Sequence, residues 1–506
     1  MAIPTFMPQI SVVLKKNIGR GTVAGTIAAS ERFKGTAREI DLTPYLWESG
    51  PVVVDKSVRQ PAGMFSITLG DKMAAGEFES LYGLIEPMDV IEIRMARNTS
   101  KYLGAGFKKN MPIKMRGFVT RIGRDEVMGE SGPTRAIIVT GHDYGKILQI
   151  MQIAYLPNEV TGQRLLTYFK FFENYGIGAE PDKPSSAFVE EVVREVLNPF
   201  LADMRAAATK SDVSSGVSPV LDIIADASVT KGVISPFGTN QWPGGTIYDM
   251  LTHYGDVGPW NEMFVEDRED APYLVYRPNP FKDPSGTLIQ EMRKAPASVT
   301  VYDEEVAVLS VARDDAAVSN YYWVNAQSYS LIGDPMLRVA AANSQPAASF
   351  YLADYPNSSP FLYGFRRMEV QTQQGPRIDG QAEAVFESGQ ASGLEFISDR
   401  RAILVANNRD NVVFESGFSR IRGREDMNPG MTMKLVRGTD AVGAARGEGV
   451  TSEFYVPAVR QEFVPFHGYT TTLTLERGTG FIERVQRDGG ANPPYLSEKR
   501  MGGVYA

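Results

Sequence analysis

Two long stretches of this 506-residue chain alternate apolar and polar side chains, and no other feature constrains the fold as strongly. Successive side chains of a strand point to opposite faces, so a period of two is typical of half-buried β-strands. The alternating stretches are residues 10–148 and about 297–480, with clear runs at 65–69, 91–95, 135–141, 299–302, 402–406, 431–435 and 469–475. We therefore expect a mainly β protein whose first stretch forms a small barrel or sandwich.

A stretch with helical spacing, residues 149–296, separates the two alternating regions. One predicted helix has its apolar residues on a single face: Val189, Val192, Val193, Val196, Leu197, Phe200 and Leu201. We expect Ser185 or Ser186 to cap this helix and Pro199 to kink or interrupt it, because proline lacks a backbone donor. The middle region is predicted to mix helix and strand, with a loop at residues 210–219.

These changes of pattern divide the chain into four predicted parts. They are a first β domain at residues 1–148, an α+β middle domain at 149–296, a second β domain at 297–480 and a C-terminal arm at 481–506. We expect polar or glycine-rich loops at residues 340–348 and 438–449. The arm is predicted because its glycine, proline and charged residues follow no periodicity.

The two β regions contain matching segments in the same order. The pairs are 86–93 (EPMDVIEI) with 428–435 (NPGMTMKL), 117–122 (GFVTRI) with 454–459 (FYVPAV), and 136–141 (AIIVTG) with 472–478 (TLTLERG). Within residues 117–122, we expect Phe118 and Ile122 on one face of a strand. Val119 and Arg121 are expected on the other face. Unrelated β domains also share a few such matches, but a true duplication would place two similar domains in one chain.

Composition excludes several classes of protein. The chain has no cysteine, so disulfides, thiolate metal sites and cysteine nucleophiles are absent. Its formal net charge of −8, without a block of like charges, argues against a protein that grips nucleic-acid phosphates. No window approaches the roughly 20 apolar residues of a membrane span, and the first 16 residues do not have the pattern of a signal peptide. We expect the chain to be made in a cytoplasm.

Residue patterns typical of catalysis are weak. The three histidines, His142, His253 and His467, are far apart in sequence and lack metal-ligand spacing. His142 and Asp143 are adjacent, but neighbouring strand residues point to opposite faces, which favours a strand-end turn over an acid/base pair. The chain has no Gly-x4-Gly-Lys-Ser/Thr phosphate loop and no Gly-x-Ser-x-Gly elbow. Residues 19–22 (GRGT) are interpreted as a hairpin turn.

Acidic and aromatic groups also have a structural interpretation. The acidic residues 303–305 and 314–315 could hold a cation or flank a glycosidic bond, but exposed turn carboxylates explain them better. Several aromatic residues could form a sugar-binding platform, although core or subunit-interface packing fits their apolar neighbours better. They are Trp242, Trp260, Trp323, Tyr248, Tyr254, Tyr321 and Tyr322.

Several ordered motifs resemble the hub proteins of tailed-bacteriophage baseplates. Residues 59–69 (RQPAGMFSITL) and 87–93 (PMDVIEI) are similar to the first barrel of such hubs. Further similar segments follow in order: 261–266 (NEMFVE), 274–281 (LVYRPNPF), 313–321 (RDDAAVSNY) with Val324, 363–366 (YGFR) and 469–478 (YTTTLTLERG). The hub part of type VI secretion spikes is related to this family, but no long C-terminal β-helix follows here. Residues 156–239 match no motif of the family.

This resemblance implies an architecture and a role. In such hubs each chain carries two tail-tube-like β-barrels, and a homotrimer forms a pseudo-sixfold ring with barrel sheets side by side around a channel. The ring adapts a hexameric tail tube to a threefold central spike. The implied partners are further copies of the chain, the tail tube or distal tail protein, the spike, the tape measure protein and other baseplate proteins. DNA would pass through the channel without specific binding.

The sequence thus predicts a structural virion protein of the tail baseplate. We expect no enzyme activity, no cofactor, and no catalytic, cofactor-binding or metal-binding residues. Two alternatives stay open: a tail-associated cell-wall hydrolase, and a carbohydrate- or receptor-binding tail protein. Activity on peptidoglycan that a paired carboxylate supports would favour the first, and reproducible binding to a glycan array would favour the second.

Overall fold

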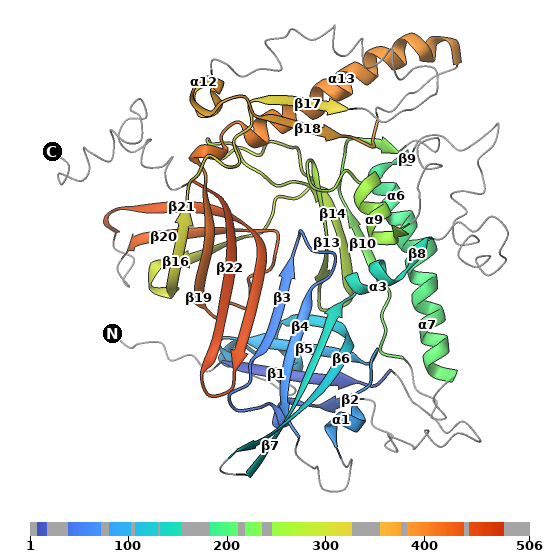
Figure 1. Cartoon of the computed structure of the whole chain (residues 1–506), viewed down its shortest axis with the longest axis vertical. Helices are drawn as coiled ribbons and strands as arrows, with labels where there is room; N and C mark the ends of the chain where they lie inside the picture. The colour runs from blue at the N-terminus through green and yellow to red at the C-terminus, as the bar shows by residue number, and fades with distance from the viewer. Residues whose placement is uncertain are drawn as a thin grey trace.

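The alternating runs, except residues 402–406, form strands of one 13-stranded, mainly antiparallel sheet (Figure 1). The computed structural model describes residues 8–17, 39–71, 80–102, 107–129, 132–153, 183–210, 218–234, 245–325, 355–375, 382–439 and 445–479. The strands of the large sheet are β1 (Gln9–Lys15), β2 (Glu39–Asp41), β3 (Val52–Ser57), β4 (Met64–Gly70), β5 (Val90–Ala96), β6 (Ile113–Gly129), β7 (Gly132–Asp143), β15 (Ser298–Tyr302), β16 (Val306–Ala312), β19 (Glu415–Arg422), β20 (Met431–Thr439), β21 (Ala445–Val464) and β22 (Gly468–Gly478). The protein is therefore mainly β, as the period-two pattern predicts.

The middle of the chain forms a smaller α+β unit beside this sheet. A three-stranded sheet, in the order β10 (Ile224–Ala227), β14 (Pro272–Pro278) and β13 (Asn261–Asp267), packs with helices α3 (Gly145–Ile150), α6 (Ser185–Val192), α7 (Asn198–Lys210) and α9 (Ile247–Tyr254). The other elements are α1 (Leu81–Leu84), α2 (Phe107–Asn110), β8 (Gln152–Ile153), β9 (Lys183–Pro184), the π-helical turn η4 (Val193–Leu197), β11 (Val233–Ile234), β12 (Gly245–Thr246), β17 (Tyr321–Asn325), α12 (Pro360–Tyr363), β18 (Arg367–Gln371) and α13 (Ala382–Asn408), with short 3-10 turns at Thr43–Tyr45, Thr99–Tyr102, Asp303–Glu305, Pro356–Ser358 and Asn411–Val413. No helix of the described residues is long and apolar enough to cross a membrane.

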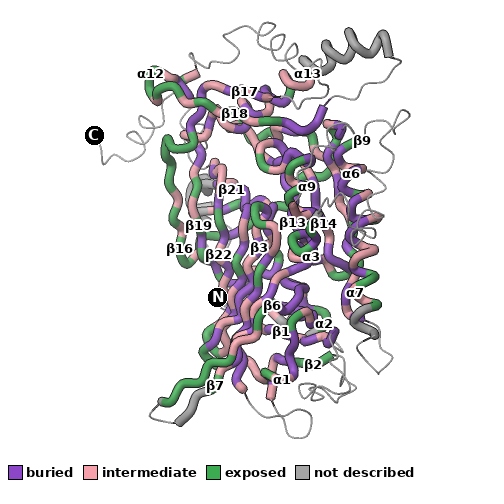
Figure 2. Tube along the Cα trace, turned by 45° about the vertical axis from the view of Figure 1, so that its right-hand side comes forward, coloured by how far each residue is buried: buried purple, intermediate pink, exposed green. Residues whose placement is uncertain are grey.

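The three largest of five apolar cores in the described residues hold these parts together. One lies mainly within the N-terminal strands β1 to β7, the first set of strands, and contains Phe65, Ile67 and Leu69, as their alternation predicts. A second lies within the C-terminal strands β15, β16 and β19 to β22, the second set of strands, around Phe454 and Leu473. The largest joins the helices of the middle unit to the sheet. Figure 2 shows buried residues along α6 and α9, whereas most of the described part of α7 is intermediate or exposed. Each core contributes to stability because apolar area is removed from water.

The two sets of strands have the same pairing order. In the first set the order is β5-β6-β7-β4-β3, and in the second it is β20-β21-β22-β19-β16. Every pair within these two series is antiparallel. The outer neighbours differ, because β1 pairs antiparallel with β5 whereas β15 pairs parallel with β20. The duplication that the sequence motifs indicate is therefore present in the strand pairing.

A turn and a bulge recur at matching positions of the two sets. Before β5, Met88 has a positive φ of 73° and its N–H donates to Val119 O at 2.9 Å. Before β20, Gly430 has a φ of 80° and its N–H donates to Val456 O at 2.8 Å. The register then shifts just after each acceptor, between Val119 and Arg121 and between Tyr455 and Ala458. A bulge of this kind leaves one residue unpaired and bends its strand.

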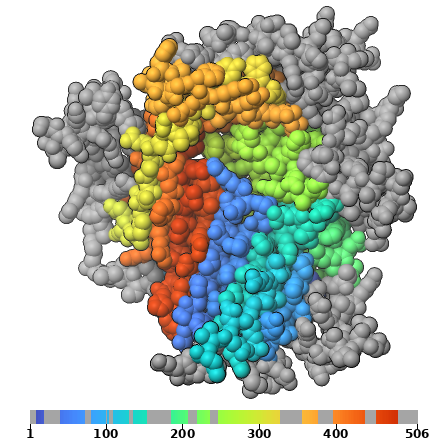
Figure 3. Space-filling view, in the orientation of Figure 1, coloured from blue at the N-terminus to red at the C-terminus, as the bar shows by residue number. Residues whose placement is uncertain are grey.

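The two sets join through one strand pair within the chain. The end of β21 pairs antiparallel with β3, from Ala458 opposite Ser57 to Phe463 opposite Val52. Figure 3 shows the orange-red surface of the second set directly against the blue surface of the first. Within the described residues the sheet has open ends at β16 and β2, and β15 ends a branch that leaves β21 through β20. Closure of each set into a barrel, and the four-part division of the chain, therefore stay predictions.

Several sequence expectations were wrong in detail. Residues 402–406, expected as a strand, belong to helix α13, because a short apolar run does not distinguish the two structures. Helix α6 starts at Ser185 after Pro184, and neither predicted serine forms a side-chain cap. Pro199 follows the π-helical turn η4, which does interrupt the helical hydrogen bonding as expected. Residues 445–449, expected in a loop, belong to β21.

The bulge in β6 overturns one prediction about side-chain direction. Ile122 packs into the same core as Val119, although the sequence places it on the other face with Phe118. The extra residue at the bulge reverses the alternation beyond it. The third matched pair of segments was also misaligned: pairing register places Val139 opposite Ile122 and Leu473 opposite Val459, so residue 136 corresponds to 470. The turn at 19–22, the loop at 340–348 and the arm from 481 lie outside the described residues.

Candidate functional site

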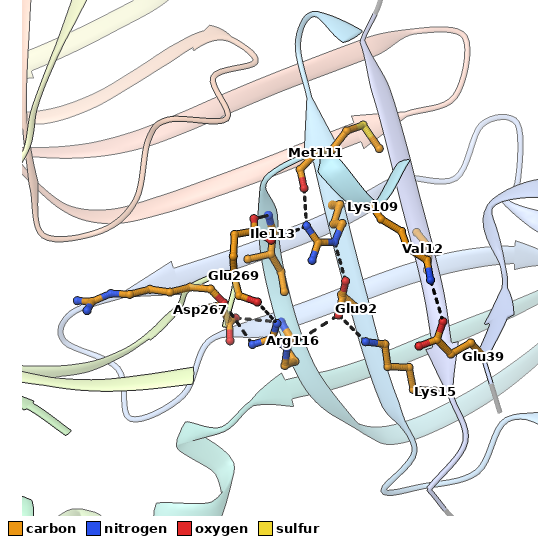
Figure 4. Close-up of polar contacts among 12 residues, drawn as sticks. Val12, Lys15, Glu39, Glu92, Lys109, Met111, Ile113, Arg116, Asp267 and Glu269 are labelled. Atoms are coloured by element: carbon orange, nitrogen blue, oxygen red, sulfur yellow. Dashed lines mark hydrogen bonds and ion pairs between the residues drawn. The ribbon is translucent and has the colours of Figure 1, made fainter. Parts of the chain in front are cut away.

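A layer of charged side chains lies between the first set of strands and the β13–β14 hairpin (Figure 4). Lys56 Nζ lies 2.6 Å from Asp267 and 3.5 Å from Asp143. The backbone N–H of Arg116 donates to Asp267 at 2.9 Å. Buried charges destabilise a protein unless they are paired, so these contacts fix how the hairpin sits on the sheet.

The same layer continues along β5 through alternating charges. Arg94 Nε donates to Glu92 at 2.6 Å, and its Nη1 donates to Glu269 at 2.7 Å and to Met111 O at 2.6 Å. The sequence predicts that Glu92 and Arg94 occupy the polar face of a half-buried strand. They are polar, but they are buried beneath the middle unit. Strand β5 is therefore covered on both faces.

Burial changes the acidity of groups in this layer. Burial raises the pKa of Asp143 to about 6, although the charge of Lys56 opposes that rise. For Lys56, burial favours the neutral amine, but the charges of Asp267 and Asp143 outweigh it and raise its pKa. Burial lowers the pKa of nearby Lys114 to about 8. Lys114 donates to Asn428 at 3.1 Å and so links the two sets of strands.

A pocket of about 430 Å³ opens beside this charged layer. Its charged lining residues are Lys15, Lys16, Arg94, Lys109, Arg116, Glu39, Glu92, Glu269 and Asp270. Five of these are basic and four are acidic, and many pair with one another, as Lys15 does with Glu92 at 2.8 Å. The lining therefore offers no strong preference for an anion or a cation.

The histidines occupy unrelated places. His142 Nδ1 lies 3.2 Å from the Thr120 hydroxyl, whereas adjacent Asp143 points into the buried layer. His253 lies in α9, and His467 lies in the turn between β21 and β22. Within the described ranges, no group of three or more histidine, aspartate or glutamate residues could hold a metal ion. The three imidazoles do not form a common site.

The acidic runs are engaged in structural ion pairs. Glu305 is buried and pairs with Arg97 and, at 2.8 Å, with Arg424. Asp315 pairs with Arg366 at 2.6 Å. Asp314 accepts a hydrogen bond from the Ala316 N–H at 2.9 Å. Asp303, Glu304, Asp314 and Asp315 are exposed, as the structural interpretation expects, but Glu305 is buried in an ion-pair cluster and not exposed in a turn.

The aromatic residues are not gathered on one surface. Trp260, Tyr254 and Tyr322 are buried, and the Trp260 indole donates to Arg400 O at 3.0 Å. Trp323 is partly exposed on β17 and donates to Asn325 at 2.6 Å. Tyr248 and Tyr321 are half-buried, and Trp242 lies outside the described residues. The buried members serve core packing, as the sequence indicates.

The most distinctive surface features are strand edges and exposed apolar side chains. Strand β16 lies at one end of the large sheet, and its outer edge has no strand partner within the described chain. In Figure 2, β16 and residues 124–128 near the end of β6 are largely exposed. Strongly exposed apolar residues are Phe466 (91%), Phe361 (85%), Met128 (84%), Leu362 (71%), Val127 (63%) and Phe365 (63%). Such groups are typical of protein contact surfaces.

Sequence reasoning missed the charged layer. Lys56 and Asp267 are 211 positions apart, so no local pattern connects them. A weak signal was present in Glu92 and Arg94. Their opposite charges on one face of a strand indicate that another part of the protein with charges of both signs could pack on that face. The unpaired edge of β16 also had a signal, since its sequence VAVLSVA contains no charged residue or proline.

Comparison with known proteins gives matches among solved structures. No family model and no curated protein matches the chain. The tail protein from Neisseria meningitidis MC58 has 12% identity over 93% of this chain and 96% of its own, with a TM-score of 0.42. The 43 kDa tail protein of prophage MuSo2 from Shewanella oneidensis has 10% identity over 92% and 98%, with a TM-score of 0.41.

A third match is the E. coli c3393 protein, a component of the type VI secretion system that is structurally similar to the T4 tail proteins gp27 and gp5. It has 9% identity over 85% of this chain and 73% of its own, with a TM-score of 0.34. The chain is thus similar to phage tail proteins and to a type VI secretion component, the two groups whose hubs its motifs resemble.

Proposed function

We propose that this protein is the structural hub of a phage tail baseplate. Three copies, each with two similar sets of strands, would form a ring with six similar surfaces. Such a ring can join a hexameric tail tube on one side to a threefold spike on the other. The observation that carries the proposal is the repeated strand order, with the same turn and bulge in both sets.

The partners of such a hub follow from its position in a tail. We propose contacts with the tail tube or distal tail protein, the spike, the tape measure protein and neighbouring baseplate proteins. The exposed apolar residues at the β6–β7 tip, on α12 and beside β22 are candidates for these contacts. DNA would cross the central channel during ejection, after the spike has left.

The charged layer has a mechanical part in this proposal. It holds the middle unit against the first set of strands through Lys56, Asp267 and Arg116. A rigid connection of this kind keeps the ring surfaces in fixed positions when the spike detaches. No chemical reaction is required of the protein.

The first test is the mass and shape of the purified protein. Light scattering should give the mass of three chains, and negative-stain electron microscopy should show a six-lobed ring with a central hole. A chain that stays monomeric even after addition of its spike protein would contradict the hub function. Activity on peptidoglycan, measured on the same sample, would favour a hydrolase instead.

A further inference from the structure

We infer that β16 of one copy pairs antiparallel with residues 121–126 of β6 in a neighbouring copy. This pair would be the intermolecular counterpart of the β21–β3 joint within each chain. The inference rests on the proposed function and deepens it, because it names the two surfaces through which copies of the chain meet.

The joint within the chain provides the template. One edge of β21 is shared by two strands in succession: β20 pairs with its first part, up to Val456, and β3 pairs with its end, from Ala458 onward. The change of partner occurs at the bulge. Val58 N donates to Pro457 O at 2.9 Å and begins the joint there.

The first set of strands has the same edge without the second partner. Strand β5, the counterpart of β20, pairs with β6 up to Phe118, and the Val119 backbone closes the turn before β5. Beyond the bulge, residues 121–126 of β6 pair with β7 on one side only, as far as the described chain extends. These residues correspond to 458–463 of β21, the segment that binds β3.

The missing partner can be identified from register. In the first set, a path across the sheet runs from Val53 of β3 to Ser66 of β4, Thr140 of β7 and Arg121 of β6, each opposite the next. In the second set the same path is Ser310, Phe418, Thr474 and Ala458. Residues 52–57 therefore correspond to 309–314, at and just beyond the end of β16. The expected register places Arg121 opposite Asp314 and Glu126 opposite Leu309.

The state of β16 favours a strand partner. It lies at the end of the sheet, Val308 on it is 44% exposed, and its seven residues include neither a charge nor a proline. Proteins normally protect such edges with charges, prolines, bulges or a cover, because an open edge binds further strands. A second copy supplies a cover for this edge in the form of its own β6.

The residues just after β16 also favour a strand partner for it. In β3, Lys56 and Ser57 extend beyond the pairing with β4 and are held in the strand by β21 alone. Their counterparts, Arg313 and Asp314, lie just outside β16. Pairing with β6 of a neighbour would lengthen β16 by these two residues. It would also bring the opposite charges of Arg121 and Asp314 together across the joint.

The two edges are different surfaces, so the contact is head-to-tail. Such contacts form a closed ring when the rotation between copies closes, and an open filament when it does not. Three copies would alternate internal and intermolecular joints around the ring. Every set of strands would then meet its neighbours in the same way.

Engineered thiols can test this register, because the natural chain has no cysteine. By analogy with Ser57 and Ala458, residues 314 and 121 would form a non-hydrogen-bonded pair with Cα atoms about 4.5 Å apart, close enough for a disulfide. A mixture of Arg121→Cys and Asp314→Cys proteins should yield covalent dimers after mild oxidation. Either variant alone should yield none, and the double variant should yield covalent trimers.

The control replaces Asp314→Cys with Val308→Cys, which is exposed on the same strand but roughly 20 Å farther along it. A mixture of Arg121→Cys and Val308→Cys should not cross-link. If light scattering shows trimers but the Arg121 and Asp314 thiols do not join, this interface is wrong and the hub function is unaffected. If the natural chain is monomeric with its spike present, the hub function and this interface both fail.

A charge exchange gives a second, independent measurement. Arg121→Asp and Asp314→Arg should each lower the association constant per joint, by roughly two- to fivefold, because like charges would face each other. The double variant should recover the natural association constant. Circular dichroism controls for folding of each variant. Additive weakening in the double variant would show that the two side chains do not meet.

Discussion

The Lys56, Asp143 and Asp267 cluster shows how one buried charge fixes the behaviour of its neighbours. Lys56 is shared by the two carboxylates, but it lies closer to Asp267, at 2.6 Å, than to Asp143, at 3.5 Å. Asp143 is therefore the less well compensated group, and burial dominates its pKa. This asymmetry gives the cluster a measurable dependence on pH.

Replacing Asp143 with asparagine should change how stability depends on pH. The pKa of Asp143 is raised to about 6 from 3.8, so the folded state holds this proton more tightly than the unfolded state does. The contribution of Asp143 to the stability of the protein therefore falls as pH rises from about 4 to about 6. Asparagine does not titrate. The stability of Asp143→Asn relative to the natural protein should therefore rise between pH 4 and pH 7, by on the order of 2 kcal/mol.

Denaturant unfolding at several pH values measures this difference. The control is Asp270→Asn, an exposed carboxylate whose pKa is lowered by the Tyr273 hydroxyl. The contribution of Asp270 to stability should depend on pH with the opposite sign, because a carboxylate with a lowered pKa stabilises the folded state and this stabilisation is lost as pH falls. A flat difference for Asp143→Asn across pH 4 to 7 would contradict the buried assignment of that carboxylate.

The paired turns before β5 and β20 show how a backbone conformation can survive a change of residue. Met88 adopts a positive φ with a side chain, at a cost, while its counterpart Gly430 does so freely. Gly430 also lies close to other groups. A Cβ there would be 2.5 Å from Arg277 Nη2 and 3.1 Å from Phe264, whereas one at Gly286 would meet nothing within 4 Å.

Gly430→Ala should therefore destabilise the protein more than Gly286→Ala. Both positions have a similar φ, 80° and 85°, so both pay the same backbone strain, about 1 kcal/mol. Gly430→Ala should cost about 1–2 kcal/mol more, because Arg277 must move from its contacts. Chemical denaturation of the two variants measures the difference, and equal losses would show that Arg277 adapts without cost.

Local patterns predicted the strands better than the contacts between them. Runs such as 65–69 alternate because one face meets a core, and that face is visible in the sequence. Residues 402–406 were misassigned because five successive apolar residues suit a helix as well as a strand. Ile122 was placed on the wrong face because a single bulged residue leaves no mark in the pattern.

The candidate site was harder to predict than the fold. Its charged layer joins residues that are far apart in sequence, such as Lys56 and Asp267, and pairing across such distances depends on the whole fold. The duplicated segments were visible because matching turns use similar residues, as Pro87 and Pro429 show. Their register was not, since strand alignment depends on bulges as well as on similar residues.

At the scale of the whole molecule, charge is the property that bears most directly on the proposed channel. The net charge is −8 per chain, so three copies would carry −24 (3 × −8). Polyanionic DNA is repelled by such a surface, and sliding through a ring would be easier without strong contacts.

The purified protein should therefore not bind duplex DNA measurably at physiological salt. Fluorescence anisotropy of a labelled duplex, at low salt and at physiological salt, measures this. A protein that used a basic surface would bind tightly at low salt and lose affinity steeply as salt rises. Such a salt-dependent affinity would contradict a neutral or acidic channel.

The two unlike edges of the chain also determine how assembly can be blocked. A copy with a proline in β16 but a natural β6 could join one neighbour and accept no other. In a cell that also makes the natural protein, a minority of such copies would terminate many rings, since each ring needs every member intact. The head-to-tail contact would thus make certain loss-of-function alleles dominant over the natural one.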